Sequence, residues 1–367
     1  MSEHIYTPRI SLRDIAKKLN LSHSTVSLAL RNHPRISEPV RKKIHETAEE
    51  MGYHPDPMLA ALAHYRQGKA EPQIHAVVAW INTWPKPEKL RSFHEFDLYW
   101  KGAMACAEKF GYRLEEFACG PLCSPKRLET ILRTRNISGI LIPPQPVSPD
   151  WADFAWKDFS AVRFGRSCVY PAVQVVTADQ MANTLLAFRK TRERGYKRVG
   201  FVTHTSSSER GPFFIAGFLM AQFELPEEER LPVLVLENVN FESDSKKLAA
   251  WIKKYKPDAI LTAAAEMRQM LERIGCRVPG DIGLVVESVL DGNSDTGIYQ
   301  NPEEIGRVAF LVVMSLINDN ARGIPPVFRQ SLVLGEWRDG HTLPDRTITA
   351  SGRVSKKSSR VAATVEI

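Results

Sequence analysis

The sequence predicts an α/β protein in two parts, a small all-helical N-terminal domain and a larger core of parallel β-sheets with crossover helices. A chain of 367 residues leaves room for two or three domains of ordinary size. Within the first 52 residues, apolar side chains recur at the three- and four-residue spacing of helices. After Gln73, short β-branched or apolar runs alternate with helical segments, which is typical of parallel strands joined by helices.

The composition excludes several classes of protein. Hydrophobic residues make up 43% of the chain, but no run of about 18 apolar residues occurs. The N-terminal MSEHIYTPRI lacks the charged-then-apolar layout of a secretory signal. We therefore expect a cytoplasmic protein with no membrane segment. The net charge of +7 favours an anionic partner.

The cysteines are odd in number and scattered, which predicts buried or inert thiols and no disulfide framework. Cys119 and Cys123 are close enough in sequence to contribute to a metal site, but no nearby Cys/His pair completes four ligands. We therefore predict no metal. The five cysteines are Cys106, Cys119, Cys123, Cys168 and Cys276.

Basic residues are concentrated near the N-terminus. Residues 1–70 hold eleven Lys and Arg against seven Asp and Glu. The C-terminal ASGRVSKKSSRVAATVEI is also basic, but its polar composition lacks apolar periodicity. We expect a disordered tail over 346–367.

Three helices are predicted near the N-terminus. Ser11 begins the first, with Asp14 three residues later as its capping partner. Ser22 caps the second after a tight turn, and Ser37 caps the third, which Gly52 ends. The apolar residues expected to face inward are Leu12, Ile15, Ala16, Leu19, Val26, Ala29, Leu30, Val40, Ile44, Ala48 and Met51.

Two short helices joined by about three residues and braced by a third form a helix-turn-helix. In such a motif the amino-terminal turn of the second helix meets base edges, and its neighbours meet phosphates. The hydroxyl-rich LSHSTVSLAL (21–30) occupies that turn. The alternative is an ordinary three-helix bundle whose polar face is only solvated, and composition alone leaves the two readings even.

The stretch ISLRDIAKKLNLSHSTVSLALRNHPRISEPVRKKIHETAEEMGYHPDPMLAALA (10–63) resembles the DNA-binding headpiece of the LacI/GalR family of bacterial transcription regulators. The resemblance lies in Asp-Ile-Ala, the Val-Ser of the second helix, a following Ile-Ser and Arg, and Gly-Tyr-x-Pro. It implies that His23 and Ser24 read bases, whereas hydroxyls and an arginine contact phosphates. The residues expected at phosphates are Ser22, Thr25, Ser27, Arg31 and Ser37.

Leu28 departs from the family pattern, because this position often holds a base-reading Arg. Contact with a thymine methyl is expected there instead of bidentate reading of guanine. The full set of residues expected at DNA is Ser11, Leu12, Ser22, His23, Ser24, Thr25, Ser27, Leu28, Arg31, Ser37, Leu62 and Ala63.

The family pattern continues into a hinge helix over 58–63. Asp56 and Pro57 suit its start, but the helix is too short to be stable alone in water. The resemblance implies that two copies fold side by side in the minor groove and that Leu62 enters the central base step. Ala63 stands where relatives often carry a basic side chain. The alternative is that Leu59 and Leu62 pack on the core.

Six runs in the rest of the chain are predicted as buried strands: 74–81, 137–143, 196–202, 231–237, 257–263 and 281–287. Such repetition exceeds one compact sheet, so we expect two α/β subdomains with a ligand cleft between them. The resemblance implies a core similar to periplasmic sugar-binding proteins, with crossovers near 163, 288 and 320. The expected divisions are 1–55 for DNA binding, 56–72 for the hinge helix and linker, 73–345 for effector binding and dimerisation, and 346–367 for the tail.

The predicted pocket departs from the family more than the headpiece does. Ala264-Ala265 replaces a usual Asn-Asp pair, Phe214 replaces a common ligand-binding Arg, and Ser288 replaces an Asp, whereas Gln300 remains where relatives use Gln. We therefore expect a more apolar, aromatic cleft. Core packing is the alternative for each aromatic. The expected effector-binding residues are Trp80, Trp84, Tyr99, Trp100, Phe214, Ser288 and Gln300.

No catalytic motif of the common hydrolase, nucleotide-binding or metalloprotease kinds occurs, so the sequence predicts no enzyme and no cofactor. The predicted function is a sequence-specific transcriptional regulator, most often a repressor in the family. It would bind a palindromic double-stranded DNA operator as a homodimer, under the control of a carbohydrate-related small molecule. The alternative is a small-molecule-binding protein or a degenerate carbohydrate enzyme without operator-binding activity.

Overall fold

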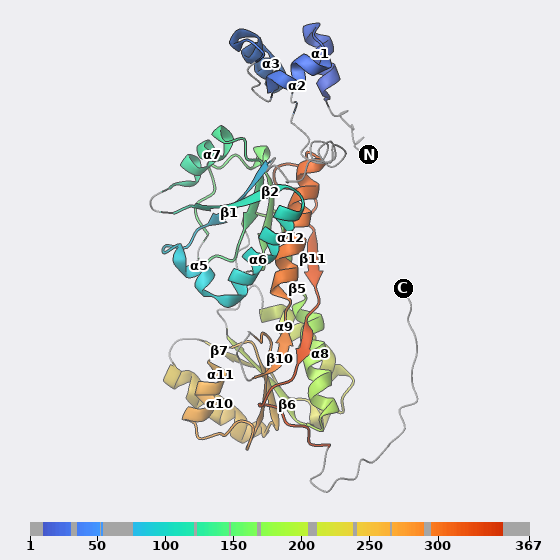
Figure 1. Ribbon diagram of the computed structural model, residues 1–367. Helices are drawn as coiled ribbons and strands as arrows, with labels where there is room; N and C mark the ends of the chain where they lie inside the picture. Colours follow the sequence, from blue (N-terminus) through green and yellow to red (C-terminus); the bar gives the residue numbers. More distant parts are fainter. Residues whose placement is uncertain are drawn as a thin grey trace, which may run out of the picture. The chain divides into compact units, whose positions relative to one another are not determined.

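The computed structural model describes residues 10–30, 35–51, 53, 76–120, 123–146, 148–166, 170–204, 211–237, 241–264, 266–289 and 295–347. The chain forms two compact units, residues 1–71 and 72–367 (Figure 1). The predicted hinge helix over 58–63, and with it Leu62 and Ala63, lies outside the described residues, as does Arg31.

The described part of the N-terminal unit forms three helices, α1 (Leu12–Leu19), α2 (His23–Leu30) and α3 (Glu38–Glu50). All three contribute to one small core. Its buried apolar side chains among the described residues are Ile15, Ala16, Val26, Ala29, Ile44 and Ala48. The predicted helix-turn-helix with a bracing third helix is confirmed.

The predicted helix starts are visible as hydrogen bonds. The backbone nitrogen and the hydroxyl of Ser11 both donate to the Asp14 carboxylate, at 2.8 and 2.7 Å. These two bonds lower the pKa of Asp14. Asn20 ends α1 in the left-handed conformation, with φ 52°. At the start of α2, the Thr25 backbone nitrogen donates to the Ser22 hydroxyl at 3.0 Å, which satisfies one of the open N–H groups of the first turn.

The first subdomain of the core is built on a six-stranded sheet, all parallel, in the order β11-β5-β4-β3-β1-β2. Helices α6 (His94–Lys109) and α12 (Pro302–Asn318) pack on one face, and α7 (Pro125–Thr134) packs on the other. Short helices α5 (Glu88–Ser92) and η1 (Trp156–Asp158) complete it. The strands are β1 (Ala76–Asn82), β2 (Tyr112–Ala118), β3 (Gly139–Ile142), β4 (Ser160–Phe164), β5 (Gln174–Ala178) and β11 (Gln330–Val333).

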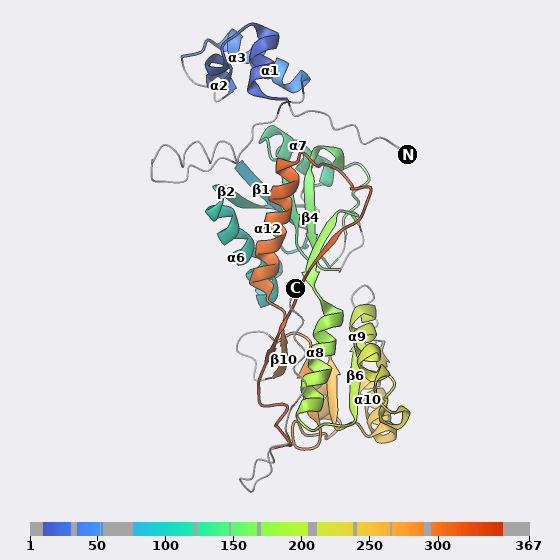
Figure 2. The same ribbon diagram turned by 90° about the vertical axis from the view of Figure 1, so that its right-hand side faces the viewer.

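The second subdomain repeats this plan with the strand order β12-β10-β9-β8-β6-β7, in which only the edge strand β12 is antiparallel. Helices α8 (Gln180–Glu193) and α9 (Gly211–Phe223) cover one face, and α10 (Phe241–Tyr255) and α11 (Met267–Arg273) cover the other (Figure 2). The strands are β6 (Val199–His204), β7 (Leu234–Leu236), β8 (Ala259–Thr262), β9 (Gly283–Val286), β10 (Thr296–Tyr299) and β12 (Glu336–Arg338). A short η3 (Glu227–Glu229) follows α9.

All six predicted strand runs contain strands, and the predicted two-sheet α/β core is confirmed. The chain changes sheet three times, between β5 and β6, between β10 and β11, and between β11 and β12. These changes fall later in the chain than the predicted positions near 163, 288 and 320. The last strand before each change is β5, β10 or β11, and none of these three was among the predicted runs.

The three connections between the subdomains are hydrogen-bonded to one another. In the first connection, the Asp179 nitrogen donates to the Val333 carbonyl at 2.9 Å, and the Asn183 side chain accepts the Gly335 nitrogen at 2.8 Å. In the second connection, the Asn301 side chain donates to the Leu334 carbonyl at 2.9 Å. The third connection, residues 333–335, therefore links the other two.

Helix α12 begins directly after the second connection. It packs so closely against α6 that the backbones of the two helices are in contact. Gly102 on α6 and Gly306 on α12 face each other's helices. A Cβ at Gly102 would lie 1.9 Å from the Glu303 carbonyl oxygen, and one at Gly306 would lie 2.1 Å from that of Tyr99. Neither position accepts a side chain unless the helices separate.

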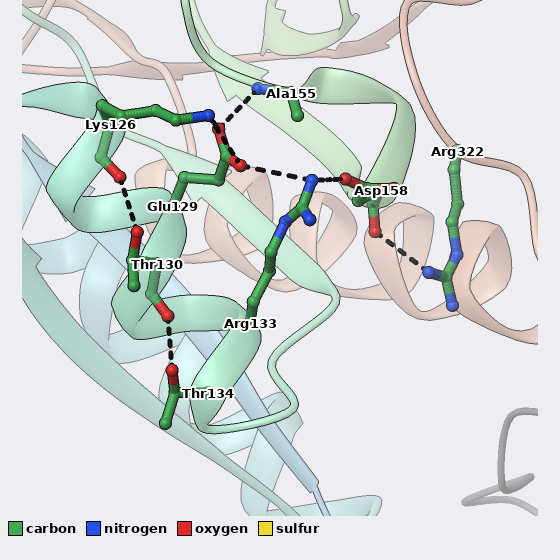
Figure 3. A network of polar contacts seen from close by, with 8 residues as sticks. All are labelled: Lys126, Glu129, Thr130, Arg133, Thr134, Ala155, Asp158 and Arg322. Carbon is green, nitrogen blue, oxygen red and sulfur yellow. Dashed lines mark hydrogen bonds and ion pairs between the residues drawn. The ribbon is translucent and has the colours of Figure 1, made fainter. Parts of the chain in front are cut away.

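A polar network holds the segment after α12 to the first subdomain (Figure 3). Glu129 on α7 is buried and accepts from the Ala155 nitrogen at 3.0 Å, while Arg133 on the same helix pairs with Asp158. The Asp158 carbonyl accepts from the Arg322 guanidinium at 3.0 Å. Arg322 follows α12, so the network ties the chain leaving this helix to α7 and η1.

Four cysteines, Cys106, Cys119, Cys123 and Cys276, are free thiols, and Cys168 lies outside the described residues. Among the described residues, no helix is both long and apolar enough to cross a membrane. The first two residues of the predicted tail, Arg346 and Thr347, are described, and the Arg346 nitrogen donates to the Arg194 carbonyl at 3.0 Å. The rest of the tail lies outside the described residues.

The close crossing of α6 and α12 predicts a large stability loss for Gly306→Ala. Its methyl group would overlap the Tyr99 carbonyl, and overpacking of this kind costs about 1–3 kcal/mol. Chemical denaturation should show the lowered free energy of unfolding. Gly120→Ala is the matched control, because a Cβ at Gly120 meets nothing within 4 Å. Equal stability of the two variants would contradict the close crossing.

Candidate nucleic-acid interface and second site in the core

The first turn of α2 presents polar side chains to solvent. Ser22, His23 and Ser24 are exposed and Thr25 is half-buried. The Ser22 and Thr25 hydroxyls are 2.8 Å apart and hydrogen-bonded to each other. The structure thus places the two predicted base-reading side chains, His23 and Ser24, side by side at the exposed amino-terminal end of the helix.

The opposite side of α2 fixes this orientation. Val26 and Ala29 are fully buried against residues of α1 and α3. At about 3.6 residues per turn, Ser24 falls on the side of the helix opposite Val26 and Ala29, whereas His23 is the first residue of the helix and lies at the edge of the buried face, where it is exposed. Ser27 and Leu28, which were expected to face outward, are half-buried. Leu28 therefore has part of its surface free for an apolar contact.

Several further residues predicted at DNA lie at helix starts. Ser11 precedes α1, where it is exposed, and Leu12 beside it is half-buried; Ser37 precedes α3 and is exposed. The open N–H groups and the dipole at a helix start favour negative charge. Hydroxyls at three helix starts form a surface suited to phosphate oxygens.

The second candidate site lies in the first subdomain, where four predicted effector residues share one aromatic cluster. Trp80 on β1 is fully buried, with its ring 5.1 Å from Phe164 and 5.4 Å from Trp100. Tyr99 stacks on Phe164 at 5.3 Å and its hydroxyl donates to Glu95 at 2.6 Å. Trp84 reaches the same cluster through Phe96.

The exposure of these aromatics differs. Trp80 and Tyr99 are buried in the core, whereas Trp84 and Trp100 are half-buried. Trp84 donates its indole N–H to the Pro144 carbonyl at 2.9 Å, which links the ends of β1 and β3. Trp84 and Trp100 therefore keep surface that a ligand can contact.

The other three predicted effector residues lie in the second subdomain. Phe214 on α9 is buried in its core. Ser288 follows β9 and is half-buried, and Gln300 follows β10 and donates to the Glu287 carbonyl at 2.5 Å. A surface hollow of about 730 Å³ lies elsewhere, between α6 and the start of α12, and none of the seven predicted residues lines it.

Glu287 is the most unusual side chain near these residues. It directly follows β9 and is 1% exposed, and the one described side chain that acts on its carboxyl group is the Thr184 hydroxyl on α8. Burial raises the pKa of Glu287 to about 8, and the Thr184 hydroxyl on α8 opposes this rise only in part. The acid is therefore mainly neutral at pH 7 and is able to donate a hydrogen bond.

Arg166, which follows β4, joins the subdomains. Its guanidinium donates to Gln180 at the start of α8 and, at 2.5 Å, to Gln330 on β11. It also lies over the Phe213 ring of α9, 3.9 Å from the ring centroid. Burial lowers the pKa of Arg166.

Two family models match the chain. One, for bacterial regulatory proteins of the lacI family, matches residues 11–56, and one for a periplasmic binding protein-like domain matches residues 188–336. The repressor CytR of Escherichia coli strain K12 is 21% identical over 319 residues, 83% of this chain and 89% of that protein. The chain therefore carries a lacI-family domain near its N-terminus, followed by a periplasmic binding protein-like domain.

Other proteins match the chain in part or in fold. The probable repressor ExuR of Bacillus subtilis strain 168 is 48% identical over 54 residues, which is 15% of this chain and 16% of that protein. The complex of the regulator CelR with cellobiose has a TM-score of 0.54 at 17% identity and covers 91% of this chain and 100% of that one. The lac repressor dimer bound to operator and the anti-inducer ONPF also scores 0.54, at 16% identity, and covers 92% and 99%.

Sequence reasoning missed Glu287 and Arg166 in the core. A signal for Glu287 was present, since a charged residue directly follows the apolar run LVV at the carboxyl end of a parallel strand, where ligands commonly bind. Arg166 follows β4, and the residues of β4 were not among the predicted strand runs. Among the described residues, no cluster of His, Cys, Asp or Glu suits a metal ion.

Glu287 predicts a pH dependence of stability. Its folded pKa of about 8 lies above the unfolded value near 4.5, so the folded state holds an extra proton between these pH values. The free energy of unfolding is therefore highest below pH 4.5 as far as Glu287 is concerned, and it falls as pH rises toward 8, because the unfolded state releases this proton first. Denaturation of Glu287→Gln should therefore show a gain over the parent that is larger at pH 8 than at pH 5.

The control for this comparison is Glu336→Gln, because Glu336 is exposed on the edge strand β12. Its stability should follow that of the parent at both pH values. A Glu287→Gln variant that did the same would show that the buried carboxyl is stabilised by partners.

Proposed function

We propose that this LacI-family regulator binds a palindromic double-stranded DNA operator as a homodimer and represses transcription. The observation that carries the proposal is the exposed first turn of α2, where His23 and Ser24 stand outside the core beside the hydroxyls of Ser22 and Thr25. Imidazole and hydroxyl groups hydrogen-bond to base edges and phosphate oxygens. The similar proteins CytR, a repressor, and ExuR, a probable repressor, support repression over activation.

Dimerisation and the palindrome belong together in this proposal. A single α2 reads only a few base pairs, and a two-fold dimer reads two half-sites of opposite orientation. The similar fold of the lac repressor, seen as a dimer on its operator, supports this arrangement. The proposed hinge function of Leu62 and the divisions at 55, 72 and 345 are part of the same proposal.

We further propose that a carbohydrate-related effector binds at the carboxyl ends of the strands where the two subdomains are joined. Trp84 and Trp100 are half-buried there and suit stacking on a sugar ring. The CelR complex with cellobiose supports this class of ligand. Glu287 and Gln300 add polar groups that the predicted apolar pocket did not include.

The alternative function is a small-molecule-binding protein, or a degenerate carbohydrate enzyme, without operator-binding activity. The exposed polar turn of α2 favours DNA, because a domain that only braced the core would not need it. The chain was also expected to be cytoplasmic, and this localisation is part of the proposal, since operator binding requires access to DNA.

Selection from random double-stranded DNA tests the proposed function. The full chain should enrich sites with two-fold symmetry, because each copy of α2 meets one half-site. Sequencing of the bound pool measures this directly. Enrichment of sites without two-fold symmetry would contradict the dimeric model. If no sequence were enriched above background, the alternative function would be favoured.

Substitutions in α2 should separate base reading from phosphate contact. His23→Ala and Ser24→Ala should change which half-site is preferred, and the loss of one base contact should cost about 1–3 kcal/mol at the preferred base. Ser37→Ala, at the start of α3, should weaken binding to all sequences alike. Competition binding against a set of single-base operator variants measures both effects. Uniform losses for all three variants would mean that the reading face is elsewhere.

Effector binding should stabilise the core against heat. A ligand at a hundredfold excess over its dissociation constant adds about 2.7 kcal/mol. A thermal-shift screen with neutral mono- and disaccharides should find such a binder, and Trp84→Ala should remove the shift while operator binding stays intact. A shift that Trp84→Ala leaves unchanged would place the ligand elsewhere.

A further inference from the structure

Helix α9 has an apolar outer face as well as an apolar inner face. Its thirteen residues, GPFFIAGFLMAQF, contain no charged side chain. Phe214 and Phe218 are buried under the helix. On the other side, Leu219 is 51%, Met220 is 57% and Phe223 is 77% exposed, and Phe213 and Ala216 continue the same face toward the start of the helix. These five residues are called the α9 stripe.

The α9 stripe contrasts with an ordinary surface helix. Such helices carry charged or polar residues opposite their buried face, and a helix that is apolar all round is normally buried. A continuous exposed apolar patch on a soluble protein marks a surface that another segment covers. Figure 2 shows α9 beside α8 in the second subdomain, and at the start of the stripe the Arg166 guanidinium lies 3.9 Å from the centre of the Phe213 ring.

The last described residues before the tail are attached to the end of α8, the helix that packs beside α9. The Arg346 nitrogen donates to the Arg194 carbonyl at the end of α8, and the Arg346 guanidinium lies 3.9 Å from the centre of the Tyr196 ring. Arg192, in the last turn of α8, forms an ion pair of 2.8 Å with Glu229, which follows α9. The last turn of α8 therefore connects the point where the tail departs to the segment after Phe223.

The charges on the two segments are complementary. Glu224, Glu227 and Glu228 follow the α9 stripe and are exposed, and none has an ion-pair partner among the described residues. Arg230 lies nearby, but its guanidinium donates to the carbonyls of Phe223 and Leu225 at the end of α9. Residues 348–367 contain four basic residues, Arg353, Lys356, Lys357 and Arg360, against Glu366 as the one acidic side chain.

We propose that residues 348–367 of this chain bind along their own α9 stripe. The basic segment 353–360 would lie at Glu224, Glu227 and Glu228, and the apolar side chains of 361–367 would cover Leu219, Met220 and Phe223. In RVAATVEI (360–367), Val361, Ala363, Val365 and Ile367 alternate with other residues, so an extended chain places all four on one side.

The length of the tail is sufficient. Twenty residues span up to about 65 Å when extended, whereas α9 is only about 20 Å long. Attachment also favours binding, because a short tether holds the tail at an effective concentration in the millimolar range. The tail can therefore bind to α9 of its own chain even if the same contact is too weak to form between separate molecules.

Hydrogen exchange of the full chain tests the proposal. The tail variant Val361→Ser/Val365→Ser/Ile367→Ser should raise the exchange rate of the α9 amides by about tenfold, the factor that corresponds to about 1.4 kcal/mol. Raised salt should increase α9 exchange in the parent chain, because it screens the contact of the basic segment with the glutamates. Val327→Ser/Phe328→Ser is the matched control, since this exposed apolar pair lies outside α9. The control variant should leave α9 exchange at the parent rate.

A photo-crosslinking residue at position 365 identifies the occupant independently. It should attach to α9 within one chain, and Met220→Ser/Phe223→Ser should abolish the crosslink. Attachment to another surface, or to a second chain, would overturn the proposal. The proposal would also be overturned if the tail variant left the exchange rate of the α9 amides unchanged. Protection of these amides that persists in the tail variant and rises with protein concentration would identify a second copy of the chain as the occupant.

Discussion

The backbone contact between α6 and α12 at Gly102 and Gly306 constrains the whole core. Helix α12 starts at the second connection between the subdomains, and it crosses α6 so closely that neither glycine has room for a Cβ. The same helix packs under β3, β4 and β5. Because interiors are close-packed, a shift of α12 disturbs the sheet on one side and the connection on the other. Through the hydrogen bonds of Asn301, Asn183 and Asp179, a movement of α12 would also displace the other two connections.

Buried charged groups lie beside these connections and work against stability. Arg166 is 8% exposed and donates to the side chains of Gln180 and Gln330, with Asp179 as the nearby carboxylate, while no described residue places a positive charge at the Glu287 carboxyl group. Burying ionisable groups without opposite charge costs free energy that hydrophobic side chains of similar size would not. Violations of this kind are typical of functional sites. Their position, at the carboxyl ends of β4 and β9, coincides with the place where α/β sheets bind ligands.

The local signals in the sequence predict the headpiece better than the core. Ser11, Ser22 and Ser37 each favour a helix start through contacts with the next few residues, so their positions in the sequence are enough to locate the three helix starts. Strands β4, β5 and β11 contain polar residues such as Arg163, Gln174 and Gln330, which interrupt the apolar run that a buried strand was expected to show. The changes of sheet follow β5, β10 and β11, none of which was predicted, and for this reason the crossover positions were predicted too early. Likewise, spacing cannot tell that Trp80 is enclosed while Trp84 keeps an exposed edge, because this depends on packing between distant segments.

The division of the chain into two units separates the choice of DNA sequence from its control. Every described residue predicted at DNA belongs to α1, α2, α3 or the residues just before them, and their orientation depends only on the core of that unit. The proposed ligand site belongs to the second unit and the proposed reading residues His23 and Ser24 belong to the first. Under the proposed function, a ligand would therefore act through the linked connections of the core on how two copies present their α2 helices, and not on the reading residues themselves.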